Sequence, residues 1–144
     1  MKRILILGKG FIGERLQEAF NYNISDTKIY SFKDAQGEID KFKPEILINC
    51  IGHTGRNVDD CELDKDKTLL TNAFVPIILA EVALRNRIKF VHISSGCIYQ
   101  FDYSKDKPIK EEKIPDFFDL FYSRTKIYAE RALEILYDKF DILI

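Results

Sequence analysis

The sequence of 144 residues lacks the features that mark several classes of protein. Its net charge is −1 and it contains no basic block, so nothing in its electrostatics favours nucleic acid as a partner. Its apolar runs are all much shorter than a membrane span. Lys2 and Arg3 precede only four apolar residues before Gly8, too few for the core of a signal peptide. We therefore expect no nucleic-acid or membrane partner.

Cysteine is scarce as well. Cys50, Cys61 and Cys97 form an odd set without the spacing of a metal site. We interpret them as three reduced thiols of an intracellular, cytoplasmic protein and expect no metal. The chain also lacks an internal repeat, a low-complexity tract or a linker. With 46% hydrophobic and 31% charged residues, it has the composition of one globular domain with a single core.

What is present begins with a glycine motif. The apolar run at residues 4–7 is typical of a strand buried on both faces. Gly8, Gly10 and Gly13 follow at G-x-G-x-x-G spacing, and residues 14–20 carry apolar side chains at helical intervals. Strand, glycine turn and helix together indicate a dinucleotide-binding unit, although an ordinary glycine-rich turn is the alternative. Gly8 would allow the tight turn, Gly10 would admit a pyrophosphate at the helix N-terminus, and Gly13 would permit close packing.

The next pattern concerns the choice of cofactor. Residues 21–27 are polar and turn-like, and residues 28–32 predict the second strand. The residue just past that strand would meet the adenosine ribose of a dinucleotide. This position falls on Lys33, which would pair with the 2′-phosphate of NADP, whereas the neighbouring Asp34 would accept from the 2′-hydroxyl of NAD. We lean to NADP, and a solvated Lys-Asp turn is the alternative.

The rest of the chain continues to alternate between strand and helix patterns. Residues 37–43 leave room for only two helical turns before a buried strand at 46–52, so a strand-plus-helix unit is missing or vestigial there. Pro76 lies inside the helix predicted after this strand. It should kink that helix and free the carbonyl of Asn72. The pattern predicts helices at 64–87 and 119–140, strands at 88–93 and 141–144, and a charged surface loop at 100–116. We therefore predict an α/β fold, a Rossmann-type doubly wound, mostly parallel sheet flanked by helices.

Three side chains in this fold are candidates for chemistry. Tyr122 and Lys126 stand at i and i+4 and would share one face of a helix. A nearby ammonium lowers the pKa of a phenol from about 10, so the pair would exchange a proton with a sugar hydroxyl or carbonyl. Ser95, just past the strand at 88–93, would hydrogen-bond the substrate oxygen whose charge changes. A surface Tyr/Lys pair and a plain turn at Ser94–Gly96 are the alternatives.

The glycine turn, the loop Ser94–Tyr99 and Tyr122-x-x-x-Lys126, in this order, resemble the extended short-chain dehydrogenase/reductases, the NAD-dependent epimerase/dehydratase family. Within that family, the stretches at 48–54 and 58–62 and Asn72-x-x-x-Pro76 look most like dTDP-4-dehydrorhamnose reductases, and Ser95–Tyr99 looks like GDP-fucose synthase. The resemblance implies an NAD(P)-dependent nucleotide-sugar reductase or epimerase. Its cofactor would be NADP or NAD, and its substrate a nucleotide sugar.

The resemblance also implies residue roles. Ser95, Tyr122 and Lys126 become the catalytic residues, with Tyr122 as acid/base and Lys126 tuning it and holding the nicotinamide ribose. Asn72 becomes the residue at the helix kink whose carbonyl anchors a water beside the lysine. The implied cofactor-binding set is Gly8, Gly10, Phe11, Ile12, Gly13, Lys33, Cys50, Ile51, Gly52, Tyr122 and Lys126.

The chain departs from the family in three respects. Its glycine motif is one residue shorter than is usual in extended members. Gly96 and Cys97 stand where the dehydratases carry an Asp-Glu pair, so we do not expect dehydration. Residues 1–144 make up one NAD(P)-binding domain, and we expect the family's C-terminal substrate lobe to be absent. The alternative function is a non-catalytic NAD(P)-binding module, or a fragment completed by another chain, and we expect a homo-oligomer or part of a longer chain.

Overall fold

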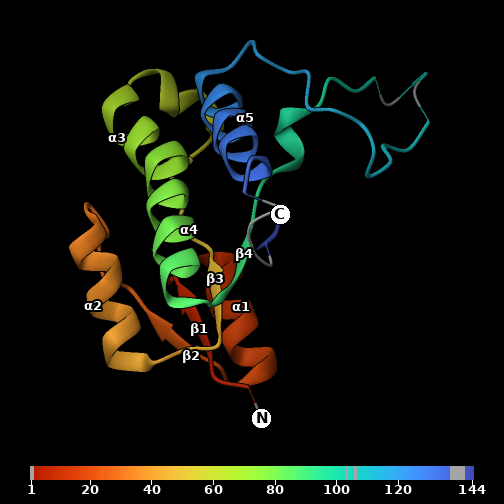
Figure 1. Ribbon diagram of the computed structural model, residues 1–144. Helices are drawn as coiled ribbons and strands as arrows, with labels where there is room; N and C mark the ends of the chain where they lie inside the picture. The colour runs from red at the N-terminus through yellow and green to blue at the C-terminus, as the bar shows by residue number, and fades with distance from the viewer. Residues whose placement is uncertain (1, 103, 106, 137–141) are drawn as a thin grey trace.

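The computed structural model describes residues 2–102, 104–105, 107–136 and 142–144 (Figure 1). In these residues five parallel strands form one sheet in the order β2-β1-β3-β4-β5. The strands are β1 (Ile4–Leu7), β2 (Asn23–Ser25), β3 (Ile46–Asn49), β4 (Lys89–His92) and β5 (Ile142–Leu143). The α-helices are α1 (Phe11–Phe20), α2 (Phe32–Phe42), α3 (Lys65–Leu69), α4 (Val75–Asn86) and α5 (Phe121–Glu134). This arrangement is the predicted Rossmann-type fold.

The helices cover both faces of the sheet. α2 and α4 pack side by side and α4 also packs against α5, whereas α1 lies on the other side of the sheet (Figure 1). β1 has β2 on one side and β3 on the other, so the strand order reverses there. Open α/β sheets bind ligands at such a reversal, outside the carboxyl ends of the strands. The fold therefore directs attention to the loops after β1, β2 and β3.

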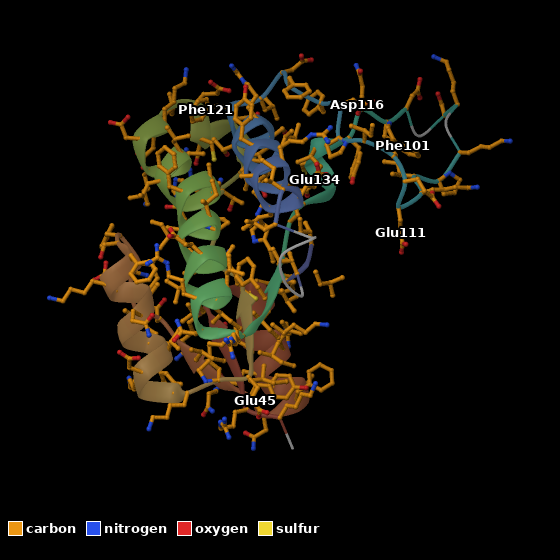
Figure 2. All side chains as sticks on the ribbon, viewed as in Figure 1. Glu45, Phe101, Glu111, Asp116, Phe121 and Glu134 are labelled. Atoms are coloured by element: carbon orange, nitrogen blue, oxygen red, sulfur yellow. The ribbon has the colours of Figure 1, made fainter. Side chains whose placement is uncertain are left out.

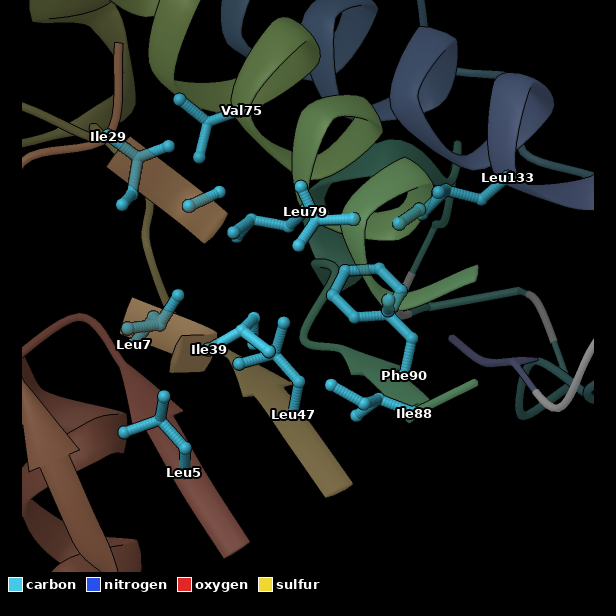
Figure 3. Close-up of a cluster of buried hydrophobic side chains, with 14 residues drawn as sticks. Leu5, Leu7, Ile29, Ile39, Leu47, Val75, Leu79, Ile88, Phe90 and Leu133 are labelled. Carbon is cyan, nitrogen blue, oxygen red and sulfur yellow. The ribbon is translucent and has the colours of Figure 1, made fainter. Parts of the chain in front are cut away.

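The hydrophobic core lies between the sheet and the helices α2, α4 and α5 (Figure 3). Leu5, Leu7, Leu47 and Phe90 point from three adjacent strands into this layer and are fully buried. β1 and β3 are predominantly apolar, as expected for central strands of a parallel sheet with helices on both faces. The core thereby holds the carboxyl ends of β1, β3 and β4 in fixed register.

The predicted second strand is wrong. β2 is Asn23–Ser25, and Ser31 instead caps α2. The Ser31 hydroxyl accepts a hydrogen bond from Asp34 N at 3.3 Å, while the Asp34 carboxylate accepts one from Tyr30 N at 3.0 Å. This reciprocal cap starts the helix at Phe32. α2 consequently has 11 residues, more than the two turns predicted from residues 37–43.

The chain between β2 and β3 contains α2 alone, which confirms the missing strand-plus-helix unit. The predicted helix at 64–87 is confirmed as three consecutive segments: α3, the π-helical η2 (Leu70–Phe74) and α4. The wide turn of η2 ends two residues before Pro76, which has no N–H to donate. By length and composition Lys65–Asn86 would also suit a membrane span, but half of its most apolar window is buried in this fold.

The last predicted elements are confirmed in part. α5 ends at Glu134, whereas the predicted helix continued to residue 140. β5 pairs in parallel with β4, as expected for the strand at 141–144. Residues 137–141, on which the end of that helix and the start of that strand were predicted, lie outside the described residues.

Candidate active site

The glycine turn after β1 needs two of its three glycines for steric reasons. Gly8 has a φ of +104°, and a Cβ there would come within 2.7 Å of the Cys50 carbonyl carbon. A Cβ on Gly13 would come within 2.0 Å of the Gly8 carbonyl oxygen, so Gly13 lets α1 pack directly on the turn. A Cβ on Gly10 would meet nothing within 4 Å. Open space therefore lies over Gly10, at the N-terminus of α1.

That space belongs to a cavity of about 430 Å³ at the carboxyl edge of the sheet, which we call the glycine cavity. Its walls come from the turn after β1, the loop after β2, the loop after β3 and the segment α3–η2–α4. The lining residues are Gly8, Lys9, Gly10, Asp26, Thr27, Lys28, Ile29, Tyr30, Cys50, Ile51, Gly52, His53, Lys67, Leu70, Thr71 and Val75. The cavity thus combines a glycine turn, an apolar wall and three lysines.

Five of the residues predicted to bind a cofactor line the glycine cavity: Gly8, Gly10, Cys50, Ile51 and Gly52. The others lie elsewhere. Phe11 and Ile12 occupy the first turn of α1, where 73% and 44% of their surfaces are exposed. Gly13 is buried under the turn.

Lys33 is the clearest misplacement. It lies on the exposed first turn of α2, outside the cavity lining, because the predicted second strand was set too late in the chain. The loop after β2 supplies Asp26 and Lys28 instead, and their side chains pair at 3.3 Å. The spacing of Ser31 and Asp34, which resembles a helix cap, is the signal that would have found this loop.

The loop after β3 is held in place by two buried amides. Asn49 Oδ1 accepts a hydrogen bond from Ile51 N at 3.0 Å. Asn72, fully buried in η2, accepts from His53 N at 2.7 Å and donates to His53 O at 2.9 Å. The Asn72 side chain therefore fixes one wall of the glycine cavity, a role that the sequence did not suggest. The role predicted for its carbonyl stays a prediction.

Ser95, Tyr122 and Lys126 come together at the carboxyl end of β4. Ser95 caps the short 3₁₀ helix η3 (Gly96–Ile98), and it forms a side-chain hydrogen bond with Tyr122 in the first turn of α5. Lys126 follows one turn later and donates from Nζ to the Ile93 carbonyl at 3.0 Å. Ser123 ties the same helix to η3 by donating to the Cys97 carbonyl at 2.6 Å.

Burial controls the ionisation of this group. It lowers the pKa of Lys126 to about 8, against opposing effects of Glu130 and Cys50. Burial also raises the pKa of Tyr122, although the hydrogen bond with Ser95 partly offsets this. The predicted lowering of the Tyr122 pKa by Lys126 is therefore wrong for this structure. Loss of water around the phenol is the largest influence on this pKa and outweighs the hydrogen bond with Ser95.

The Tyr122–Lys126 pair adjoins the glycine cavity through Cys50. Cys50 lines the cavity, and its thiol, whose pKa burial raises to about 11, interacts electrostatically with the Lys126 ammonium. His92 is the last residue of β4, and its Nδ1 lies 2.9 Å from Asn49 Nδ2. Burial, and secondarily the charge of Lys126, lowers the pKa of His92 to about 3. Cys50 and His92 therefore both stay neutral at neutral pH beside the lysine.

A second cavity, of about 310 Å³, adjoins Ser95. Ser94, Ser95, Glu130 and the loop at 111–115 contribute to its lining. We call it the serine cavity. Among the residues that the structure describes, no cluster of three or more His, Cys, Asp or Glu side chains is arranged to hold a metal ion.

Comparison with known proteins gives a consistent result. A family model described as the RmlD substrate binding domain matches residues 1–143. The bifunctional dTDP-4-dehydrorhamnose 3,5-epimerase/dTDP-4-dehydrorhamnose reductase of Arabidopsis thaliana is 32% identical over 143 residues, covering 90% of this chain and 47% of the relative. A trifunctional UDP-glucose 4,6-dehydratase/UDP-4-keto-6-deoxy-D-glucose 3,5-epimerase/UDP-4-keto-L-rhamnose-reductase of the same plant is also 32% identical, covering 91% of this chain and 21% of that relative.

Solved structures agree. A dTDP-4-dehydrorhamnose reductase from Clostridium acetobutylicum superposes with a TM-score of 0.77 at 28% identity, over 96% of this chain and 51% of that one. A dTDP-4-dehydrorhamnose reductase from Bacillus anthracis, solved in complex with NADP, gives a TM-score of 0.79 at 26% identity, over 98% and 52%. This chain therefore spans about half the length, or less, of the proteins that it matches.

Proposed function

The chain belongs to the RmlD substrate binding domain family, and from this membership we propose that it is the coenzyme-binding part of an NAD(P)-dependent sugar-nucleotide reductase. One observation carries the proposal. Ser95, Tyr122 and Lys126 meet at the carboxyl end of β4, next to a cavity that begins at a glycine turn. The relatives named as dTDP-4-dehydrorhamnose reductases support the same reaction class.

The residues of the glycine cavity fit a dinucleotide. The open space over Gly10 and the free N–H groups at the start of α1 suit a pyrophosphate. The loop after β2 would hold the adenosine ribose, and Lys126 would hold the ribose at the nicotinamide end. A bound nicotinamide coenzyme would supply the hydride that reduces a sugar carbonyl.

Tyr122 would donate the proton that the reduced carbonyl oxygen needs. Its pKa is raised by burial, so the phenol stays protonated at neutral pH, as a donor must. Ser95 would hydrogen-bond the same oxygen and align it with the phenol. Lys126, still charged at neutral pH with a pKa of about 8, would offset the negative charge that develops on Tyr122.

The raised pKa of Tyr122 also helps to choose between the reductase and the alternative functions, an epimerase or a non-catalytic module. An epimerase that begins by oxidising a sugar hydroxyl needs Tyr122 as a base in its first step, and a protonated phenol is a poor base. A non-catalytic NAD(P)-binding module would need the glycine cavity but not the convergence of Ser95, Tyr122 and Lys126. We therefore place the reductase first.

The test of this proposal is Tyr122→Phe, which removes the phenol and keeps the ring. With NADPH and a 4-keto sugar nucleotide, turnover should fall about a hundredfold or more, the scale of a lost acid/base group. Calorimetry should show nearly unchanged coenzyme affinity. Tyr128→Phe is the matched control, because Tyr128 lies on the same helix with 57% of its surface exposed. Near-normal turnover in Tyr122→Phe would move the chemistry to another group.

We further propose that the coenzyme is NADP, and that Lys28 recognises it. Lys28 lines the glycine cavity just after β2, where the 2′-phosphate would lie, and its pairing with Asp26 reduces the repulsion of that carboxylate. NADP should bind more tightly than NAD, and Lys28→Ala should reduce this difference in affinity between the two coenzymes. Lys33→Ala, outside the cavity, should leave the difference unchanged. Equal affinities of the parent chain for both coenzymes, measured by calorimetry, would contradict the assignment.

A further inference from the structure

The start of α5 has no cap of its own. Leu120 at the N-cap position makes no side-chain hydrogen bond, and the first turn contains no acidic residue. The first N–H groups of a helix have no partner within the helix, so an uncapped first turn frays. Tyr122 lies in this turn. Its position therefore depends on whatever holds the turn from outside.

Glu62 provides such a contact from 59 residues away in the sequence. It ends the 3₁₀ helix η1 (Val58–Glu62), and its Oε1 accepts a hydrogen bond from Phe121 N at 2.6 Å. Phe121 is the first residue of α5. The end of α5 that carries Phe121 faces α3 (Figure 2). A carboxylate at this place satisfies a free donor and also interacts favourably with the helix dipole.

The surroundings hold Glu62 in this position. Lys65 Nζ lies 3.4 Å from Glu62 Oε2 and also 5.5 Å from the centre of the Phe121 ring. The Arg124 guanidinium lies 5.7 Å from the same ring. The hydrogen bond from Phe121 lowers the pKa of Glu62, and Lys65 adds to this effect, so the carboxylate is charged at neutral pH.

The opposite side of the turn is held by Ser123, which donates to the Cys97 carbonyl in the Ser95 loop at 2.6 Å. The first turn of α5 is thus fixed between η1 and η3. From this arrangement we infer that Glu62 is a positioning residue: it anchors the first turn of α5 and so sets the Tyr122 phenol against Ser95. The inference rests on the proposed function, in which Tyr122 transfers the proton. A displacement of a reacting group by about 1 Å lowers rates by up to about a hundredfold.

The test needs a variant that removes the contact and one that preserves it. Glu62→Ala removes the acceptor, whereas Glu62→Gln keeps an oxygen at the same place. Glu45→Ala is the matched control, because the Glu45 carboxylate likewise accepts a distant backbone N–H, that of Arg3 at 2.9 Å. Glu45 lies at the far end of the molecule from Phe121 (Figure 2). Any loss of stability common to the two alanine variants is therefore not specific to α5.

The readout is the Tyr122 signal in ¹⁹F NMR of the chain labelled with 3-fluorotyrosine, assigned as the signal that Tyr122→Phe removes. Glu62→Ala should shift or broaden this signal and alter its titration, Glu62→Gln should restore it, and Glu45→Ala should leave it unchanged. With NADPH and a keto-sugar nucleotide, Glu62→Ala should lower kcat about tenfold at nearly constant KM. An unmoved Tyr122 signal in Glu62→Ala would overturn the inference.

This measurement separates the inference from the proposed function. The NMR signal reports on the position of Tyr122 even if the chain reduces no sugar, so absent turnover in the parent chain counts against the function alone. If Glu62→Ala does not fold, Phe121→Pro removes the donor instead, since proline suits the first position of a helix. Phe121→Ala controls for loss of the ring. Equal Tyr122 signals in these two variants would equally overturn the inference.

Discussion

Lys126 holds a positive charge where water scarcely reaches it. Only 3% of the residue is exposed, and its ammonium donates one hydrogen bond, to the Ile93 carbonyl. Its pKa of about 8 lies below the ordinary value of 10.5, so at pH 7 the folded chain keeps the charge at a cost of about 3 kcal/mol. Buried groups with such shifts occur preferentially at functional sites. We therefore regard Lys126 as a residue kept for function at the expense of stability.

We expect Lys126→Met to raise the melting temperature at pH 7, because it removes a buried charge and keeps an apolar stem of similar length. The parent chain should gain stability relative to this variant as the pH rises from about 8 toward about 10.5. In that interval the folded lysine has lost its proton and the unfolded lysine still holds one. Thermal unfolding by circular dichroism checks both effects, and calorimetry should show weaker coenzyme binding. A lower melting temperature at pH 7 would contradict this account.

Among the elements, α1 depends most directly on close backbone approach. It can lie against the turn after β1 only because position 13 has no side chain. The turn after β1 exposes its backbone N–H groups to the glycine cavity and leaves open space there. The packing of one helix on one turn therefore determines both local stability and the shape of the coenzyme site.

Gly13→Ala should destabilise the fold by about 1–3 kcal/mol, the usual cost of overpacking, and should weaken coenzyme binding. Gly37→Ala is the contrasting change, because a Cβ on this residue of α2 meets nothing within 4 Å. It should stabilise the fold by about 0.5–1 kcal/mol, since alanine loses less entropy in a helix. Urea unfolding measures the two effects. Equal stability of the two variants would show that α1 does not need the close approach.

At the scale of the whole molecule, the sheet has two outer strands, β2 and β5, each paired on one side only among the described residues. β5 is short, and 56% of Leu143 is exposed. An open, apolar sheet edge favours pairing with another strand. The glycine cavity, by contrast, is lined entirely by described residues of this chain.

We therefore expect the 144-residue chain to bind NAD(P) by itself and to self-associate, unless further residues of a longer polypeptide cover the edge. Sedimentation over a wide concentration range, with and without NADPH, measures both properties. A monomer at every concentration would contradict the expected self-association. Binding of NADPH without turnover of a keto-sugar nucleotide would agree with a substrate site that these residues do not complete.

The sequence by itself determined those parts of the protein that depend on neighbours in the chain. The unit from β1 through the glycines to α1, the disturbed helix before Pro76 and the shared helical face of Tyr122 and Lys126 were all predictable. In each case the spacing of residues that are close together in the sequence decides the backbone conformation. The alternation of strands and helices determined the parallel sheet, because a helix between two strands returns the chain to the edge where the first strand began.

Only the tertiary structure decided the features that depend on distant contacts or on exclusion of water. The polar β2 is a strand because it pairs with β1, and this pairing places Lys28 rather than Lys33 in the lining of the glycine cavity. Asn72 and Glu62 act on backbone groups 19 and 59 residues away, which no local pattern reveals. The pKa of Tyr122 rises because burial removes water from the phenol, and burial is a property of the assembled fold rather than of the spacing to Lys126.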